Sequence, residues 1–259
     1  KALLLTQGMH GMISQVEGLA KALNLDYRHQ TIKLKNFWNY IPPKFTPIST
    51  GILCEKLSCD AKVIISCGRK SVIPSIALKK KFGKGILNIH IQDPKVKLSN
   101  FDFIVAPEHD GLKGKNVLTS KGAVHYLTND ELDINESYLK SRINSQKKIV
   151  TLIIGGPTKH YNYNKKVINN IFSKVKQNFL EKNYQLIVVP SIRTPQNIID
   201  EAKNYFNEDQ IIIPNVDKKA YLCSLKNADH IIVTCDSTSM ISEAAITGKP
   251  IYVAQMPTI

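Results

Sequence analysis

Short apolar runs recur along the chain, and stretches with helical spacing separate many of them. The first unit has an apolar run at 3–5, and the stretch after it places Ile13, Val16, Leu19 and Leu23 on one side of a helix. Such runs are typical of buried parallel strands, and residues three or four apart share a helix face. Repeated units of this kind predict an α/β fold with parallel sheets and right-handed crossovers.

Two halves of the chain show this pattern, and a polar segment separates them. The segment 129–147 is rich in Asn, Asp, Glu, Ser and Lys, which indicates a helix and a linker. We therefore predict two Rossmann-like parallel-sheet domains, 1–128 and 148–259, that face a cleft. The further strands are expected at 27–34, 63–65, 86–91, 102–105, 116–119, 149–154, 185–189, 211–213, 231–233 and 251–253.

The stretch from 229 to 253 predicts a strand, a helix and a second strand. Gly248 suits a left-handed turn after the helix, and Pro250 cannot continue it. Four consecutive polar residues all favour a helix N-terminus, so we expect one of them to cap the helix. These are Asp236, Ser237, Thr238 and Ser239. The buried face of the helix is expected to carry Met240, Ile241, Ala244 and Ala245.

Candidate ligand-binding residues follow the strands of the second half. The hydroxyls and backbone N–H groups of 237–239 would lie at the carboxyl end of the sheet, where α/β folds bind phosphate-bearing ligands. Glu243 lies about a turn further on, within reach of sugar hydroxyls of the same ligand. Gly155 and Gly156 follow a strand and would let the backbone approach a phosphate, with added charge from Lys159. The alternative for the paired glycines is a simple tight turn.

Arg193 stands where the sequence predicts the start of a helix. Pro195 suits the first turn of that helix, with Thr194 as its cap. A cation at a helix N-terminus is disfavoured by the helix dipole. This conflict indicates that Arg193 is present for an anion such as phosphate, with Ser191 and Thr194 as hydrogen-bond donors.

The strand ends of the first half carry a second set of candidates. Gly8 and Gly11 flank His10 in the loop after the first strand, where an imidazole could act as a general base. Arg69 begins a helix after the third strand, an arrangement suited to an anion. Other polar side chains that follow strands are Gln92, Asp93 and Glu108. We expect this set to form the acceptor side, with His10 or Asp93 as the base that deprotonates an acceptor hydroxyl.

The composition limits the classes of function. The net charge is +14, which reflects either a compositional habit of the source or a basic face for anionic lipid or a pyrophosphate substrate. No basic–aromatic motif of a nucleic-acid-reading module is present. The five cysteines include no CxxC pair, so we expect reduced thiols and no metal site. No apolar run approaches the roughly 20 residues of a membrane span, which favours a cytoplasmic protein with optional peripheral membrane contact.

Two other features leave alternatives open. The irregular segment 36–47 carries Trp38, Tyr40 and Phe45, and it suits a lid, a membrane-facing loop or core packing. The chain starts at Lys1 and stops at Ile259, directly after a predicted strand. We therefore expect a C-terminal segment to be missing from this sequence.

The segment 237–251 combines a serine-rich turn, Glu243 and the sequence Gly-x-Pro-Ile. It resembles the donor-binding segment of GT-B glycosyltransferases, a group that includes the lipid-linked GlcNAc transferase of peptidoglycan synthesis. In that group the glutamate holds the ribose of a nucleotide-sugar, the serine-rich turn faces its phosphates, and a glycine loop approaches the pyrophosphate. UDP-GlcNAc 2-epimerases share the pattern. The resemblance implies a GT-B-like fold that needs no metal ion or other cofactor.

Six short sequence segments occur in a fixed order along nearly the whole chain. They are 66–69, 89–94, 107–110, 154–160, 190–195 and 237–250. This set resembles the mitochondrial-fission "elongated mitochondria" family of alphaproteobacteria and plants, whose members usually continue beyond the equivalent of Ile259. The plant members resemble adaptors that bring a dynamin-like GTPase to mitochondria.

These observations lead to one expected function and two alternatives. We expect a metal-independent glycosyltransferase of the GT-B type that uses a nucleotide-sugar and a lipid-linked or cell-envelope acceptor. The first alternative is a non-catalytic adaptor that keeps the fold, because fold does not imply activity. The second is an enzyme like the UDP-GlcNAc 2-epimerases, which would need several acidic residues around one sugar.

Overall fold

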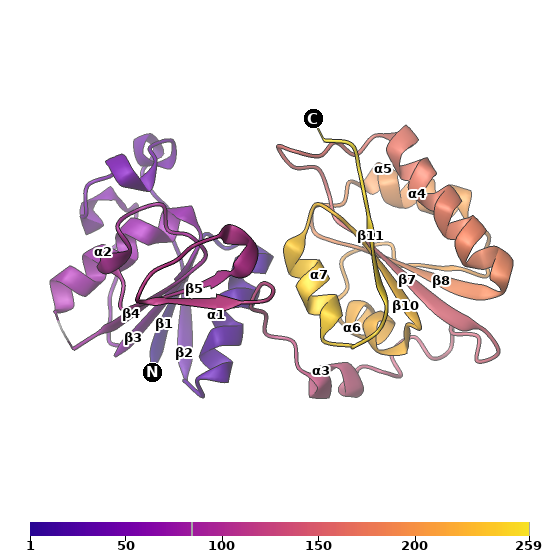
Figure 1. Cartoon of the computed structure of the whole chain (residues 1–259), viewed down its shortest axis with the longest axis horizontal. Coiled ribbons are helices and arrows are strands. Elements are labelled where there is room, and N and C mark those ends of the chain that lie inside the picture. The colour runs from indigo at the N-terminus through magenta and orange to yellow at the C-terminus, as the bar shows by residue number, and fades with distance from the viewer. Residues whose placement is uncertain (84, 259) are drawn as a thin grey trace. The chain divides into compact units, whose positions relative to one another are not determined.

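A computed structural model describes residues 1–83 and 85–258, and it forms two compact units. The first unit spans Lys1–Tyr126 and the second begins at Leu127. Each unit contains one sheet of parallel strands with helices packed against it (Figure 1). The predicted α/β class with two Rossmann-like parallel sheets is therefore confirmed.

The first unit is built on a six-stranded sheet in the order β2-β1-β3-β4-β5-β6. Its strands are β1 (Ala2–Thr6), β2 (Tyr27–Thr31), β3 (Val63–Cys67), β4 (Leu87–Ile91), β5 (Phe103–Pro107) and β6 (Val117–Ser120). Its α-helices are α1 (His10–Ala22) and α2 (Arg69–Phe82). The strand order reverses direction between β1 and β3, which makes that position the topological switch point of the sheet.

Alternate side chains of β1 enter two separate hydrophobic clusters, one on each face of the first sheet. Leu3 and Leu5 pack in a cluster with Ile76 of α2. Leu4 packs in the other cluster with Val16 of α1. Since side chains alternate across a strand, one short apolar run supplies both faces. The two helices therefore cover opposite faces of the sheet.

The second unit has a five-stranded sheet in the order β11-β10-β7-β8-β9. Its strands are β7 (Lys148–Ile154), β8 (Tyr184–Pro190), β9 (Ile211–Ile212), β10 (His230–Thr234) and β11 (Ile251–Ala254). Its helices are α3 (Asn129–Ile134), α4 (Lys165–Asn178), α5 (Gln196–Tyr205), α6 (Lys218–Asn227) and α7 (Thr238–Ala245). The order reverses between β7 and β10, which is the Rossmann arrangement.

The polar segment after Leu127 packs as part of the second unit. Thr128 caps α3 by accepting a hydrogen bond from the Glu131 N–H. Further along, Leu139 is buried in a cluster that contains Ile187 of β8 and Cys223 of α6. The segment expected to be a helix and linker thus contributes to the core of this unit.

Helix α7 follows the sequence expectation at its start and departs from it on its buried face. Ser237 is the N-cap and accepts a hydrogen bond from the Met240 N–H. Of the four residues expected to be buried, only Ala244 is, whereas Met240 and Ile241 are half-buried and Ala245 is exposed. The reason is position, because α7 packs on β10 and β11 at one side of the sheet, where fewer neighbours surround it.

Candidate ligand-binding site at the carboxyl end of the second sheet

The loops after β7 and β10 meet at the switch point of the second sheet. Gly155 and Gly156 follow β7, and Asp236 and Ser237 follow β10, its neighbour in the sheet (Figure 1). Parallel α/β sheets bind their ligands outside the carboxyl ends of the strands at this kind of position. The topology therefore brings two groups of predicted site residues, far apart in sequence, to one place.

Asp236 joins these loops through four hydrogen bonds to its buried carboxylate. Its side chain has no exposed surface. Oδ2 accepts from Arg193 Nη2 at 2.8 Å and from the Gly156 N–H at 3.1 Å. Oδ1 accepts from the hydroxyls of Tyr163 at 2.5 Å and Thr234 at 2.7 Å. A buried carboxylate needs such partners to offset its lost hydration.

The paired glycines are required by the close approach of these loops. A Cβ at Gly155 would lie 2.2 Å from Asp236 Oδ2, and one at Gly156 would lie 2.0 Å from the carbonyl oxygen of Arg193. A larger residue at Gly156 would require a shift of the backbone, and one at Gly155 would displace the Asp236 carboxylate. The Gly155 N–H donates to Thr234 Oγ1 at 2.8 Å, and the Gly156 N–H donates to Asp236 Oδ2. Both glycine N–H groups therefore bind side chains at the end of β10 or just after it.

The anion that Arg193 faces in the structure is the carboxylate of Asp236. The guanidinium also donates to the Gly156 carbonyl oxygen at 3.1 Å, and 31% of the side chain is exposed. The loop that carries Arg193 is a polar turn that is hydrogen-bonded to the end of β7, and its side chains do not cap the next helix. The expectation that Thr194 caps the next helix is wrong, because Pro195 is the N-cap of α5. The Thr194 hydroxyl instead lies 2.8 Å from the carbonyl oxygen of Ile154, the last residue of β7.

Tyr163 keeps its proton at this site. Burial, followed by its hydrogen bond to Asp236, raises the pKa of Tyr163 well above its ordinary value. Its hydroxyl is therefore a permanent donor to the Asp236 carboxylate. Tyr163 is not predictable from the sequence, because nothing local marks a tyrosine in a polar loop as the partner of a carboxylate about seventy residues later.

Glu243 is held by a tyrosine that sequence analysis also missed. The hydroxyl of Tyr221 on α6 donates to Glu243 Oε2 at 2.9 Å, and Glu243 is half-buried. Ser239 is half-buried at the first turn of α7, and Thr238 beside it is exposed. Lys159 is exposed in the loop that follows Gly156. The carboxylate of Glu243 thus has a fixed position on the helix whose N-terminus lies at the switch point.

The predicted acceptor residues of the first unit gather around its own switch point. Gly8, His10 and Gly11 follow β1, and Arg69 follows β3, the neighbouring strand. His10 is exposed and is the first residue of α1. The Arg69 guanidinium donates to the carbonyl oxygen of Asn39. The structure therefore groups these four residues at two adjacent strand ends.

Asp93 and its neighbours lie further along the same sheet. Because β3 lies between β1 and β4, His10 and Asp93 follow strands that are not adjacent. Asp93 accepts hydrogen bonds from the Lys95 N–H at 2.8 Å and Lys95 Nζ at 2.6 Å. Partial burial acts to raise the pKa of Asp93, but the Lys95 hydrogen bonds outweigh it and lower that pKa. A carboxylate paired in this way is a weak base.

Gln92 and Glu108 differ in how firmly they are held. The Gln92 side chain donates to Gln15 Oε1 of α1 at 3.3 Å, and Gln92 adopts a left-handed backbone with φ of 81°. Glu108 is exposed in the short turn after β5. Of the two, only Gln92 has a side chain directed to the helix that starts at the switch point.

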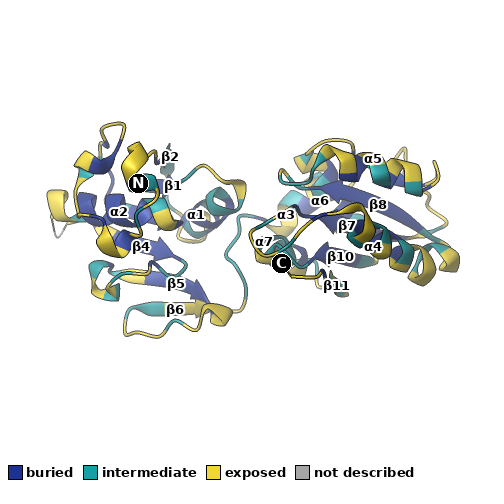
Figure 2. Cartoon of the chain, turned by 90° about the horizontal axis from the view of Figure 1, so that it is seen from above, coloured by how far each residue is buried: buried dark blue, intermediate teal, exposed yellow. Residues whose placement is uncertain are grey.

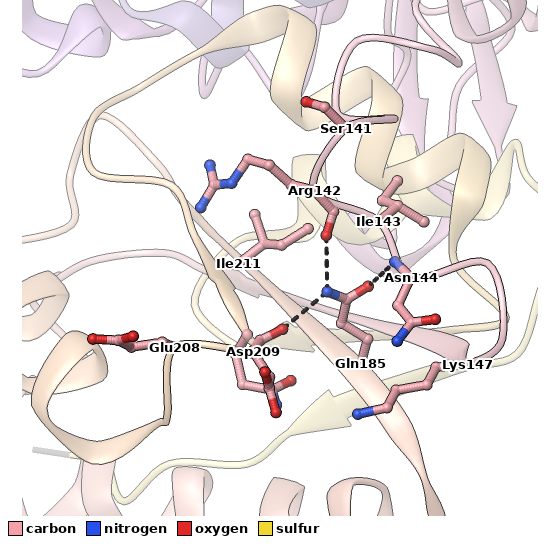
Figure 3. A pocket seen from close by; sticks show the side chains of 10 residues that line it. Ser141, Arg142, Ile143, Asn144, Lys147, Gln185, Glu208, Asp209 and Ile211 are labelled. Atoms are coloured by element: carbon pink, nitrogen blue, oxygen red, sulfur yellow. Dashed lines mark hydrogen bonds between the residues drawn. The ribbon is translucent and has the colours of Figure 1, made fainter.

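A separate polar pocket lies at the opposite end of the second sheet. It has a volume of about 430 Å³ near the first residues of β7, β8 and β9, and none of the predicted site residues lines it (Figure 3). The Gln185 amide forms one wall by accepting from the Asn144 N–H and donating to the carbonyl oxygens of Arg142 and Asp209. Because β-strand amino ends are not the usual ligand edge, the carboxyl end stays the candidate site.

Neither a metal cluster nor a membrane span is found in the parts of the chain that the structure covers. Over residues 1–83 and 85–258, no group of three or more His, Cys, Asp or Glu side chains could hold a metal ion. Over the same residues, no helix has both the length and the apolarity to cross a bilayer.

Comparison with known sequences connects the chain to one family. The family model described as "Mitochondrial fission ELM1" matches residues 10–258. An uncharacterized protein of Rickettsia prowazekii, RP120, is 27% identical over 95% of this chain and 78% of its own length. The mitochondrial fission protein ELM1 of Arabidopsis thaliana is 24% identical over 74% of this chain, and this match spans about half (51%) of the plant protein.

Comparison with solved structures identifies the fold. The UDP-GlcNAc 2-epimerase of Methanocaldococcus jannaschii, solved with UDP-GlcNAc and UDP, has a TM-score of 0.54 at 16% identity and covers 98% of this chain and 83% of its own. The epimerase of Neisseria meningitidis has a TM-score of 0.57 at 11% identity over 97% and 82%. A family 9 glycosyl transferase of Veillonella parvula has a TM-score of 0.54 at 9% identity over 98% and 80%. The expected GT-B-like fold is confirmed.

Proposed function

The chain belongs to the mitochondrial fission ELM1 family, and we propose that its second unit binds a nucleotide-sugar. We further propose that the protein is a metal-independent glycosyltransferase of the GT-B type that acts on a lipid-linked or cell-envelope acceptor. The observation that carries the proposal is the meeting of the Gly155-Gly156 loop and the Asp236-Ser237 loop at the switch point of the second sheet.

Helix α7 supplies the groups of the proposed donor site that would bind the phosphates and the ribose. Its N-terminus carries the free N–H groups and the partial positive charge that favour a diphosphate. Ser237, Thr238 and Ser239 add hydroxyls there. Glu243, fixed by Tyr221, offers a carboxylate acceptor for the hydroxyls of the ribose.

The charge of the leaving diphosphate would be offset without a metal ion. A guanidinium has five N–H donors, and Arg193 uses Nη1 for the Gly156 carbonyl and Nη2 for Asp236. Its remaining donors and its exposed surface are available to a ligand phosphate. A fixed cation and a helix N-terminus that are aimed at developing negative charge lower the barrier for its departure.

Within this proposal, His10 is a better general base than Asp93. His10 is exposed at the switch point of the first sheet, whereas Asp93 is paired with Lys95 and has a lowered pKa. His10→Ala is therefore expected to reduce sugar transfer by about 100-fold or more, and Asp93→Ala by less. Equal losses in the two variants, measured by product formation at saturating donor, would contradict this assignment.

A second function, that of a non-catalytic adaptor, is favoured by one specific observation. The N–H groups of Gly155 and Gly156 already bind Thr234 and Asp236, and the charge of Arg193 is balanced by that same Asp236. A loop closed by the chain's own carboxylate would keep the fold stable without any nucleotide. The plant relative is named as a mitochondrial fission protein, and its name states no enzymatic activity.

A thermal-shift screen separates the two functions. The wild type and Glu243→Ala are heated with UDP, GDP, CMP and their sugars, and Glu208→Ala serves as the control because Glu208 lines the pocket at the opposite end of the sheet. A ligand at about a hundredfold its dissociation constant stabilises a protein by about 2.7 kcal/mol, which raises Tm by a few degrees.

The proposal predicts a nucleotide-dependent shift that Glu243→Ala loses and Glu208→Ala keeps. If folded wild-type protein shows no shift with any nucleotide, the glycosyltransferase proposal is wrong and the adaptor function takes its place. A bound UDP-sugar that is converted to another sugar nucleotide without an acceptor would instead identify an epimerase.

A further inference from the structure

The connection between β2 and β3 exposes several large apolar side chains in a short stretch, residues 36–48, which we name the aromatic segment. It contains two 3-10 helices, Asn36–Asn39 and Pro43–Phe45. The exposed fraction is 67% for Phe37, 83% for Tyr40 and 70% for Phe45. Exposed apolar residues that stand alone are ordinary, but three exposed aromatic rings within nine residues are a concentration that favours a binding role.

The aromatic segment is held in place by its inner side. Trp38 packs against the hydrophobic cluster on the α2 face of the first sheet. The Asn39 side chain donates to the Leu34 carbonyl oxygen at 3.1 Å, and its own carbonyl accepts from Arg69 of α2. The inner side of the segment therefore packs on the core and holds the segment in place, whereas the rings of Phe37, Tyr40 and Phe45 remain exposed.

The sequence interval that holds the aromatic segment carries only positive charges. No Asp or Glu occurs between Asp26 and Glu55, and the interval contains Lys33, Lys35 and Lys44, besides Arg28, which pairs with Asp60 at 3.1 Å. Lys33, Lys35 and Lys44 are exposed. The Lys44 ammonium lies 5.7 Å from the centroid of the Phe45 ring, so cationic and aromatic groups are interleaved. Exposed rings beside exposed lysines suit an anionic surface with an apolar layer beneath it.

We propose that the aromatic segment docks the protein onto an anionic lipid membrane. The rings of Phe37, Tyr40 and Phe45 would enter the boundary between headgroups and acyl chains, and the lysines would bind anionic headgroups. A protein partner is the less suitable occupant, because lysine is depleted in protein interfaces and is attracted to anionic lipid. The surface would hold the protein at a membrane as a peripheral protein.

The fluorescence of Trp38 can report contact between the aromatic segment and a membrane. Trp38 is the only tryptophan among the 259 residues, and it lies inside the aromatic segment. The protein is titrated with vesicles of phosphatidylcholine, with and without phosphatidylglycerol, in which brominated acyl chains quench nearby indole fluorescence. The proposal predicts binding and Trp38 quenching with the anionic vesicles, reduced by added salt, and little of either with phosphatidylcholine alone.

Two sets of variants assign the contact to the segment. Phe37→Ser, Tyr40→Ser and Phe45→Ser combined are expected to weaken vesicle binding by about tenfold or more, because the apolar contact is lost. Lys33→Gln, Lys35→Gln and Lys44→Gln are expected to weaken it by about fivefold per lysine at low salt. All six side chains are exposed, so the fold should persist, as circular dichroism would verify.

Exposed apolar residues of the second unit provide the matched control. Ile134 and Ile192 are 79% and 69% exposed, and Ile134→Ser with Ile192→Ser should leave vesicle binding unchanged. The proposal is overturned if wild-type protein does not bind anionic vesicles, or if the triple aromatic variant binds them as wild type does. Capture of a protein partner through the segment, without vesicle binding, would overturn it as well. The nucleotide thermal shift of the aromatic variants is independent of either result.

Discussion

At the scale of single residues, Asp236 is the centre of the candidate site. From the sequence, Asp236 is predicted only as one of four candidate capping residues, because capping is a local property that four neighbours share. Its actual role depends on Arg193 and Tyr163, which lie 43 and 73 positions away in sequence. Such a network is fixed by tertiary structure, and no spacing rule along the chain can reveal it.

Replacing Asp236 by Asn should destabilise the second unit. The change leaves the Arg193 guanidinium without its charge partner and turns an acceptor toward other donors, at an estimated loss of about 2–3 kcal/mol in the free energy of unfolding. Urea unfolding measures this loss. Asp200→Asn is the control, since the Asp200–Lys203 pair is exposed and should contribute little. Equal stability of Asp236→Asn and wild type would contradict the network.

His90 is a buried titratable group that predicts how the stability depends on pH. It is 1% exposed on β4, and its Nδ1 lies 2.8 Å from Ser66 Oγ. Burial lowers the pKa of His90 from 6.5 to about 3, although the nearby Asp93 opposes this. The imidazole thus binds a proton in the unfolded chain at a pH where the folded state remains neutral.

The stability contributed by neutral His90 is fully present above pH 6.5 and is lost as the pH falls toward 3. A single such group adds a slope of about 1.4 kcal/mol per pH unit to the free energy of unfolding. His90→Asn should be less stable at neutral pH but show a shallower slope in acid. An unchanged slope in His90→Asn would refute the assignment.

At the scale of elements, the strands are the most predictable part of the fold. The ranges expected for strands overlap all eleven strands that the structure describes within residues 1–83 and 85–258. Most of these ranges are short apolar runs, the signature of strands buried on both faces, whereas β2 is a half-buried strand. The Ser237 cap is predicted as one of four candidates, but the cap expected at Thr194 is wrong. The Thr194 hydroxyl binds the carbonyl oxygen of Ile154 at the end of β7, and this tertiary contact overrides the local preference for helix capping.

The close packing of the loop after β7 against the loop that carries Arg193 can be tested by a substitution at Gly156. Gly156→Ala would place a Cβ 2.0 Å from the backbone carbonyl of Arg193, so one of the two loops must move. We expect a loss of about 2 kcal/mol or more in the free energy of unfolding. Gly85→Ala is the control, because no atom of the described residues lies within 4 Å of a Cβ added there. Similar unfolding curves for both variants would refute the close approach.

At the scale of the whole molecule, the GT-B-like fold is predictable from repeated strand–helix units and from segments that resemble a family. The candidate site is only partly predictable. Gly155, Gly156, Arg193 and Ser237 are found because each follows a strand. The partners that fix them are not. In the second unit the strands β7 and β8 are buried, whereas the edge strand β11 is partly exposed (Figure 2). Activity cannot be read from the fold, because unrelated functions share it.

The most direct test of the central claim is amide hydrogen exchange with and without a UDP-sugar, followed by mass spectrometry of peptides. We predict that the ligand protects the peptides spanning 154–160, 190–196 and 236–245, and that Glu243→Ala weakens this protection. Protection of the segment 141–147 beside the opposite pocket, or no protection anywhere in the second unit, would contradict a nucleotide-sugar site at the carboxyl end of its sheet.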